Sequence, residues 1–234
     1  MTRHELKEQL QHDHFTDAVA EVLTYTQTHR EQVIRWVITG LVVLVLAGGA
    51  FWYSSYRASV RRQDLQAAFD VLEEPVGAAN PSGGKTFPTN DAKKQASMKA
   101  LRDVIAKDGG TREGLIAQYY LGTLKVQNGD VKGAEADLTA VANSSSQCAP
   151  LAKIALAELY AGENRVREAQ KLLTEIVNKP TDLVSKAQAQ ILLARLDQST
   201  NPQEAKRILQ SLRASNPDPA VARAADEISA QLTK

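Results

Sequence analysis

The chain has 234 residues, enough for one ordinary domain with an appendage. Its formal net charge of +1 gives no basis for binding nucleic acid. The single cysteine, Cys148, excludes an intramolecular disulfide. Only 5% of the residues are aromatic, whereas alanine, leucine, glutamine, lysine and glutamate are abundant. This mixture favours helix over sheet, so we expect an all-α protein.

The first 35 residues contain every histidine of the chain: His4, His12, His14 and His29. A helix is predicted from about Phe15, because apolar residues recur there at near-helical spacing. His12 and His14 could hold a metal weakly, but a stable site needs three or four ligands. We therefore expect a solvated segment here, with no metal and no cofactor.

Residues 36–56 read WVITGLVVLVLAGGAFWYSSY and carry no charge, with Arg35 and Arg57 on either side. As a helix this stretch rises about 31 Å, which matches a hydrocarbon core of about 30 Å. Aromatic residues stand at both ends, where the membrane interface would lie. The sequence therefore predicts a single transmembrane helix over 36–56.

Two other interpretations of this stretch are a cleaved signal peptide, with Gly48 and Ala50 at the cleavage site, and a buried core helix. The 35 residues before it are too long and too acidic for a signal peptide's short basic region. This favours an uncleaved anchor. Arginines flank both sides of the span, so charge alone leaves its orientation open.

Three stretches of the second half resemble one another: residues 117–141, 152–176 and 187–212. Small residues recur 35 positions apart in the first two stretches and at the matching positions of the third. The first set is Gly122, Ala157 and Ala194; the second is Ala134, Ala169 and Ala205. Small residues let two helices approach closely, so each stretch is predicted to be a helical hairpin that stacks on its neighbours.

Further helices are predicted on both sides of these hairpins, over residues 58–73, 91–107 and 219–232. The first would continue the membrane helix into the repeat domain. The last begins with Asp218 as N-cap and Pro219 in the first turn, and would cap the end of the array.

Residues 79–86, ANPSGGKT, end like a phosphate-binding loop. Such a loop joins a strand to a helix. Here the preceding segment is an amphipathic helix, and Pro88 removes a backbone donor where the next helix should begin. We therefore expect a flexible loop within 75–90 that binds no nucleotide.

No histidine lies in the repeat region and Cys148 has no neighbouring base, so the chain is not expected to be an enzyme.

The repeated pattern resembles the tetratricopeptide repeat family. Leu121, Leu156 and Leu193 precede the small residue of each first helix, as in that family, although the family's early tryptophan is absent. The resemblance implies a helical-hairpin superhelix that binds protein partners on its concave face. The face would include Ile116, Tyr119, Thr123, Leu151, Ile154, Glu158, Gln188, Ile191 and Arg195. Because several of these are apolar, we expect an apolar or helical partner segment; packing between helices is the alternative role for each residue.

The layout of the whole chain resembles the YfgM-like proteins, the ancillary SecYEG translocon subunit family of the bacterial inner membrane. The resemblance implies an N-terminal cytoplasmic segment (1–35), a transmembrane helix (36–56), a helical extension and flexible loop (57–90), and a periplasmic repeat domain with a C-terminal capping helix (91–234). It also implies work beside SecYEG and periplasmic chaperones in protein export. The alternative is a scaffold or adaptor for another envelope complex, such as one for cell division or cell-wall synthesis.

Overall fold

The computed structural model describes residues 30–77, 86–216 and 218–232. The predicted helix from about Phe15, the His12 and His14 pair, and residues 79–85 of the stretch ANPSGGKT lie outside these residues. The chain divides into two compact units, Met1–Ser59 and Val60–Lys234, and each is described by itself.

The described part of the first unit is helical and belongs to α2 (Arg30–Glu73), which merges the two helices predicted over 36–56 and 58–73. The apolar side chains between residues 36 and 56 are exposed, as the values of 75% for Trp36 and 73% for Trp52 illustrate. Trp52 stacks on Tyr56, with 6.3 Å between the ring centroids. Nothing in the chain's described residues covers this surface.

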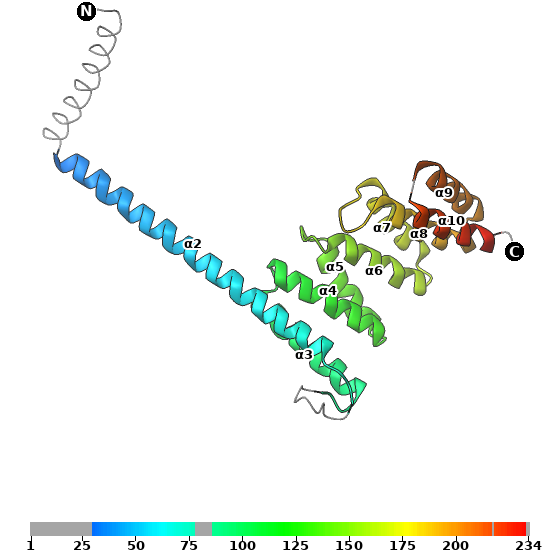
Figure 1. The fold of residues 1–234 in the computed structure, drawn as a ribbon, viewed down its shortest axis with the longest axis horizontal. Coiled ribbons are helices and arrows are strands. Elements are labelled where there is room, and N and C mark those ends of the chain that lie inside the picture. Colours follow the sequence, from blue (N-terminus) through cyan, green and yellow to red (C-terminus); the bar gives the residue numbers. More distant parts are fainter. Residues whose placement is uncertain (1–29, 78–85, 217, 233–234) are drawn as a thin grey trace, which may run out of the picture. The chain divides into compact units, whose positions relative to one another are not determined.

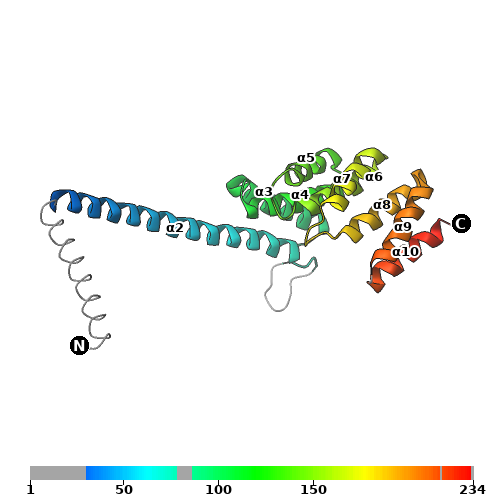
Figure 2. The same ribbon diagram turned by 90° about the horizontal axis from the view of Figure 1, so that it is seen from above.

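The second unit contains the last turns of α2 and eight further helices among its described residues. They are α3 (Asn90–Asp108), α4 (Arg112–Gln127), α5 (Val131–Ala142), α6 (Ala149–Gly162), α7 (Val166–Asn178), α8 (Lys186–Thr200), α9 (Pro202–Ser215) and α10 (Pro219–Gln231). Successive pairs form hairpins that follow one another in chain order, from green to red in Figures 1 and 2. The predicted all-α superhelix is confirmed. Among the described residues the only β contact is an isolated bridge between Val76 and Phe87.

The core of this unit is divided into clusters along the array. Leu65 and Ala68 of α2 pack with Leu101 and Val104 of α3, which makes a first hairpin. At the other end, α10 packs on α8 and α9 through Ala225 and other apolar residues. Each cluster joins helices that are near in sequence, as expected for a stacked array.

Capping side chains fix where several helices begin. Thr89 accepts a hydrogen bond from the Ala92 amide at 3.1 Å, and Ser185 accepts one from the Gln188 amide at 3.1 Å. Asp218 caps α10 by accepting from the Ala220 amide at 2.8 Å, as its sequence position predicted. These bonds satisfy amides that the first turn of a helix leaves unpaired.

The turn between α4 and α5 and the turn between α6 and α7 share one geometry. Gly129 has φ of 75° and Asn164, 35 positions later, has φ of 61°. The backbone amide of the next residue donates a hydrogen bond to the end of the preceding helix. The Asp130 amide donates to Lys125 O at 2.9 Å, and the Arg165 amide donates to Tyr160 O at 2.7 Å. Glycine and asparagine are the residues that adopt this left-handed conformation most readily, so the repeat extends to the helix endings.

The small residues found in the sequence are buried between helices. Ala134, Ala169, Ala194 and Ala205 are completely buried. A Cβ placed on Gly122 would lie 2.8 Å from Cγ of Leu138 on the partner helix. The repeated small residues therefore mark positions where a larger side chain would not fit between the two helices of a hairpin.

One arginine ties α5, α6 and α7 together. The Arg165 guanidinium binds both carboxylate oxygens of Glu135, at 2.9 and 3.0 Å, and both of Glu168, at 2.6 and 2.8 Å. It also lies 3.9 Å from the centroid of the Tyr160 ring, whose hydroxyl donates to Glu135 at 2.9 Å. Hydrogen bonds from Arg165 hold the pKa of the Glu135 carboxyl below its usual value of 4.5.

The connection that carries the Gly-Lys-Thr motif leaves a helix rather than a strand. Helix α2 ends at Glu73, and backbone bonds of 3.0 Å then join Gly77 and Pro75 to Phe87. Helix α3 begins only at Asn90, after the Thr89 cap. The described flanks therefore lack the strand-to-helix junction that holds phosphate in nucleotide-binding loops.

We predict that Gly122→Ala lowers the free energy of unfolding by about 1–3 kcal/mol, the usual cost of overpacking a core. The added methyl group would press on Leu138, which is fully buried and has little room to move. Thermal and urea unfolding of the full chain in mild detergent, followed by circular dichroism, would measure the loss. Gly162→Ala is the control, because a Cβ there meets nothing within 4 Å and alanine favours helix. Equal stability of the two variants would contradict the close contact.

We also predict that Arg165→Met lowers the melting temperature at neutral pH and that the difference from wild type narrows in acid. Because the pKa of Glu135 is lowered in the folded state, its contribution is full above 4.5 and is lost as the pH falls below that value. The pKa of Glu168 is lowered by the same arginine, so it acts in the same direction. Arg167→Met, two residues away on an exposed position, is the control. A pH-independent difference would rule out this ionic origin.

Candidate protein-binding surface

The first helices of successive hairpins, α4, α6 and α8, supply the nine residues predicted to bind a partner. We call the surface formed by these helices the inner face. Three of the predicted residues are exposed: Glu158, Gln188 and Arg195. Five are half-buried: Ile116, Tyr119, Thr123, Leu151 and Ile191. The set is therefore mixed, and its members differ in what they can offer a partner.

Several of the predicted residues contribute to packing. Ile154 is 9% exposed and lies in a cluster with Ile176, Val184 and Ala189, against which Leu151 also packs. Ile116 packs on the first hairpin and Ile191 on the last. These side chains therefore pack mainly against neighbouring helices and expose little surface to a partner.

Three aromatic rings meet where α2 and α4 lie together. The rings of Phe69 and Tyr120 stand edge to face, with centroids 4.8 Å apart, and the rings of Tyr120 and Tyr119 do so at 5.4 Å. Tyr120 is 39% exposed, which makes it one of the few large hydrophobic side chains of the second unit that reach solvent. Aromatic groups of this kind are common anchors in protein interfaces, because they bury much area with few rotatable bonds.

The phenol of Tyr119 links this aromatic group to α6. Burial raises the pKa of Tyr119, and the nearby ionisable groups Tyr120, Cys148 and Glu158 raise it further. The hydroxyl therefore keeps its proton and can donate a hydrogen bond to a partner. Two of the predicted residues, Tyr119 of α4 and Glu158 of α6, therefore lie close enough to interact electrostatically.

A cleft of about 360 Å³ opens between α6 and α8. Glu158 and Arg195 line it from opposite helices, and no ion pair joins them in the described structure. The other lining residues are small or apolar: Ala157, Ala161, Leu173, Leu192, Leu196 and Ser199. The cleft can therefore take an apolar side chain between a carboxylate and a guanidinium.

Alanines on α6 explain why this space is open. Ala157 and Ala161 are one helical turn apart, so both face α8. Ala157 is buried against Ala169 and Leu173 of α7, whereas Ala161 stands exposed at the rim. A larger residue at position 161 would fill the mouth of the cleft without entering the core.

Sequence reasoning missed Phe69, Tyr120, Leu192 and Leu196. Phe69 and Tyr120 come from different helices, so only the fold brings their rings together. Leu192 and Leu196 are four positions apart, so they lie on the same face of α8. That spacing alone does not tell whether the face packs in the core or lines a cleft. The adjacent pair of tyrosines at 119 and 120 was the one available signal.

The described residues hold no clustered metal ligands, and the one thiol of the chain is partly covered. Within the described ranges no group of three or more His, Cys, Asp or Glu side chains is arranged to hold a metal ion. Cys148 is a half-buried free thiol that packs beside the cluster of α5 and α6.

Comparison with known proteins agrees with this architecture. The model of the tetratricopeptide repeat-like domain family matches residues 31–185. Two solved structures are similar, both of TPR-like repeats with nearly identical sequences from a protein described as a kinesin light chain of Podosopora anserina, one of them carrying a single substitution. Each is 19% identical, covers 74% of this chain and 92% of that one, and superposes with a TM-score of 0.50, a likeness in fold alone. No curated protein matches the chain.

Proposed function

Because the chain belongs to the tetratricopeptide repeat-like domain family, we propose that it is a membrane-tethered module that binds protein partners on its inner face. The observation that carries this proposal is the cleft between α6 and α8, which has apolar walls and unpaired opposite charges at Glu158 and Arg195. Repeat arrays offer extended surfaces of this kind to peptides and protein segments. The expected partner segment is apolar or helical and inserts one side chain into the cleft.

Residues 36–56 of α2 support the membrane tether. They form one helix long and apolar enough to cross a bilayer, and none of this span is buried in the protein. An exposed surface of this composition needs lipid or another apolar cover. We infer a single-pass protein with residues 1–35 in the cytoplasm and the repeat domain outside the inner membrane.

The partner class that we favour is the protein-export machinery: SecYEG and periplasmic chaperones. The support is the arrangement of one anchor followed by a repeat domain, which resembles the ancillary translocon subunit family. An apolar cleft also suits clients that expose hydrophobic segments before they fold. The second candidate is a scaffold or adaptor for a cell-division or cell-wall synthesis complex, which the same surface could serve.

We predict that Ala161→Trp in the full-length protein reduces partner recovery from gently solubilised membranes. The indole would fill the mouth of the cleft, and the exposed position should leave the fold intact. Recovery would be quantified by affinity capture and mass spectrometry. Ala136→Trp, at an exposed position on α5, is the control because it adds the same bulk elsewhere.

The identity of the proteins that depend on the cleft would decide between the two candidates. Translocon subunits or periplasmic chaperones that are lost with Ala161→Trp and kept with Ala136→Trp would support the export function. Division or cell-wall proteins with the same dependence would support the scaffold. Equal recovery with both variants would contradict the cleft as the binding place.

We predict that a cysteine in the repeat domain is labelled by a membrane-impermeant maleimide in intact spheroplasts. Ser145→Cys in a Cys148→Ser background gives a single thiol at an exposed position. A cytoplasmic repeat domain would instead be labelled only after the membrane is permeabilised. That result would overturn the orientation and with it the periplasmic chaperones as partners.

A further inference from the structure

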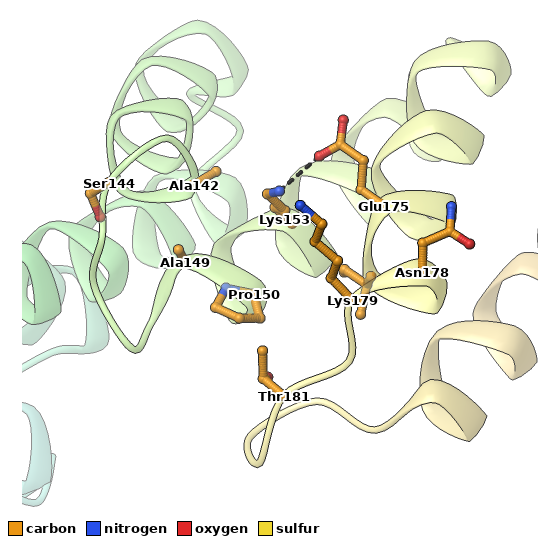
Figure 3. A pocket seen from close by; sticks show the side chains of 10 residues that line it. Ala142, Ser144, Ala149, Pro150, Lys153, Glu175, Asn178, Lys179 and Thr181 are labelled. Carbon is orange, nitrogen blue, oxygen red and sulfur yellow. Dashed lines mark hydrogen bonds and ion pairs between the residues drawn. The ribbon is translucent and has the colours of Figure 1, made fainter.

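A second hollow of about 440 Å³ lies where α5 ends, α6 begins and α7 ends (Figure 3). We call it the inter-repeat groove. It uses Ala149, Pro150 and Lys153 from the first turns of α6, whereas the cleft of the inner face uses the other half of that helix. The two places are therefore distinct and can be altered one at a time.

The groove has an apolar floor. Ala142, Ala149 and Ile176 are all at least nine-tenths buried, and Pro150 lies beside them. The alanines are too short to fill the space between the helix ends. An apolar group of modest size would lose its contact with water here without any movement of the core.

The wall contributed by the connection from α7 to α8 is fixed. The Thr181 amide donates to Val184 O at 3.0 Å, and the Thr181 hydroxyl accepts from the Val184 amide at 3.2 Å. Val184 itself is completely buried in the cluster with Ile154 and Ile176. Hydrogen bonds and a buried side chain therefore hold this side of the groove in place.

The groove also has an excess of positive charge. Lys153 Nζ pairs with Glu175 Oε2 at 2.7 Å, whereas no ion pair in the described structure involves the exposed Lys179. Figure 3 shows the Lys179 side chain pointing toward Lys153. The groove therefore contains two ammonium groups and one carboxylate, and that carboxylate pairs with Lys153, which leaves the positive charge of Lys179 without an ion pair beside an apolar floor.

We propose that the inter-repeat groove binds an acidic peptide segment of a protein partner. A partner carboxylate would lie against Lys179, and an apolar side chain next to it would pack on Pro150 and Ile176. One spare positive charge complements one carboxylate. One spare positive charge matches a single carboxylate better than a doubly charged phosphate, and the apolar floor beside it matches a neighbouring apolar side chain, so the groove favours an acidic peptide over a free phosphate.

The test is selection of a phage-displayed random heptapeptide library on the full-length protein in mild detergent. Enriched peptides are then synthesised with a fluorophore and titrated by anisotropy. We expect enriched sequences with Asp or Glu beside an apolar residue, and a loss of affinity of about tenfold in Lys179→Glu. Lys171→Glu is the matched control, because it makes the same charge change at an exposed position of α7 outside the groove.

Two further measurements separate this site from the others. Ala161→Trp should leave the affinity of these peptides unchanged, and a loss would assign them to the inner-face cleft instead. Binding to vesicles that contain phosphatidylglycerol would be compared for wild type and Lys179→Glu. The proposal is overturned if no acidic sequences are enriched, if Lys179→Glu and Lys171→Glu bind them equally, or if only vesicle binding depends on Lys179.

Discussion

The close approach of two helix backbones within each hairpin is the constraint on which the repeat unit depends. Gly122 has no room for a Cβ against Leu138, and Ala134 and Ala169 are buried completely. Because the residues at these contacts are small, leucines on either side can interdigitate. Small residues on α6 also leave space at the two hollows: Ala157 and Ala161 line the cleft, and Ala149 lines the inter-repeat groove. Packing and candidate binding surfaces therefore have one origin.

Charged groups add a second level of order between hairpins. The Arg165 guanidinium joins a carboxylate of α5 to one of α7 and covers a tyrosine ring of α6. Its position after a residue of positive φ aims it at these partners. By contrast, Glu158, Arg195 and Lys179 have no ion pair in the described structure. This contrast separates charges that hold the array together from charges that are available to another molecule.

The sequence predicted the hairpins well because their cause is local. A spacing of 35 residues, a run of small residues and the pair Asp218 and Pro219 all act within one or two helices. The Glu135 and Arg165 pair spans 30 residues, and the Phe69 and Tyr120 contact joins α2 to α4. The two hollows depend on where helix ends and loops meet. Such features follow from the three-dimensional arrangement, so no periodicity in the chain reveals them.

The order of packing along the array has a consequence for how the chain acquires its structure during synthesis. Helices from α3 to α10 contact mainly their neighbours in sequence, and the connections between successive hairpins are all short. Contacts of low sequence separation form quickly and need little loop closure. Each hairpin can thus settle on the preceding one as it emerges, in a vectorial process that runs from the amino end. Helix α10 packs on α8 and α9, so it is the last of these helices to find its partners.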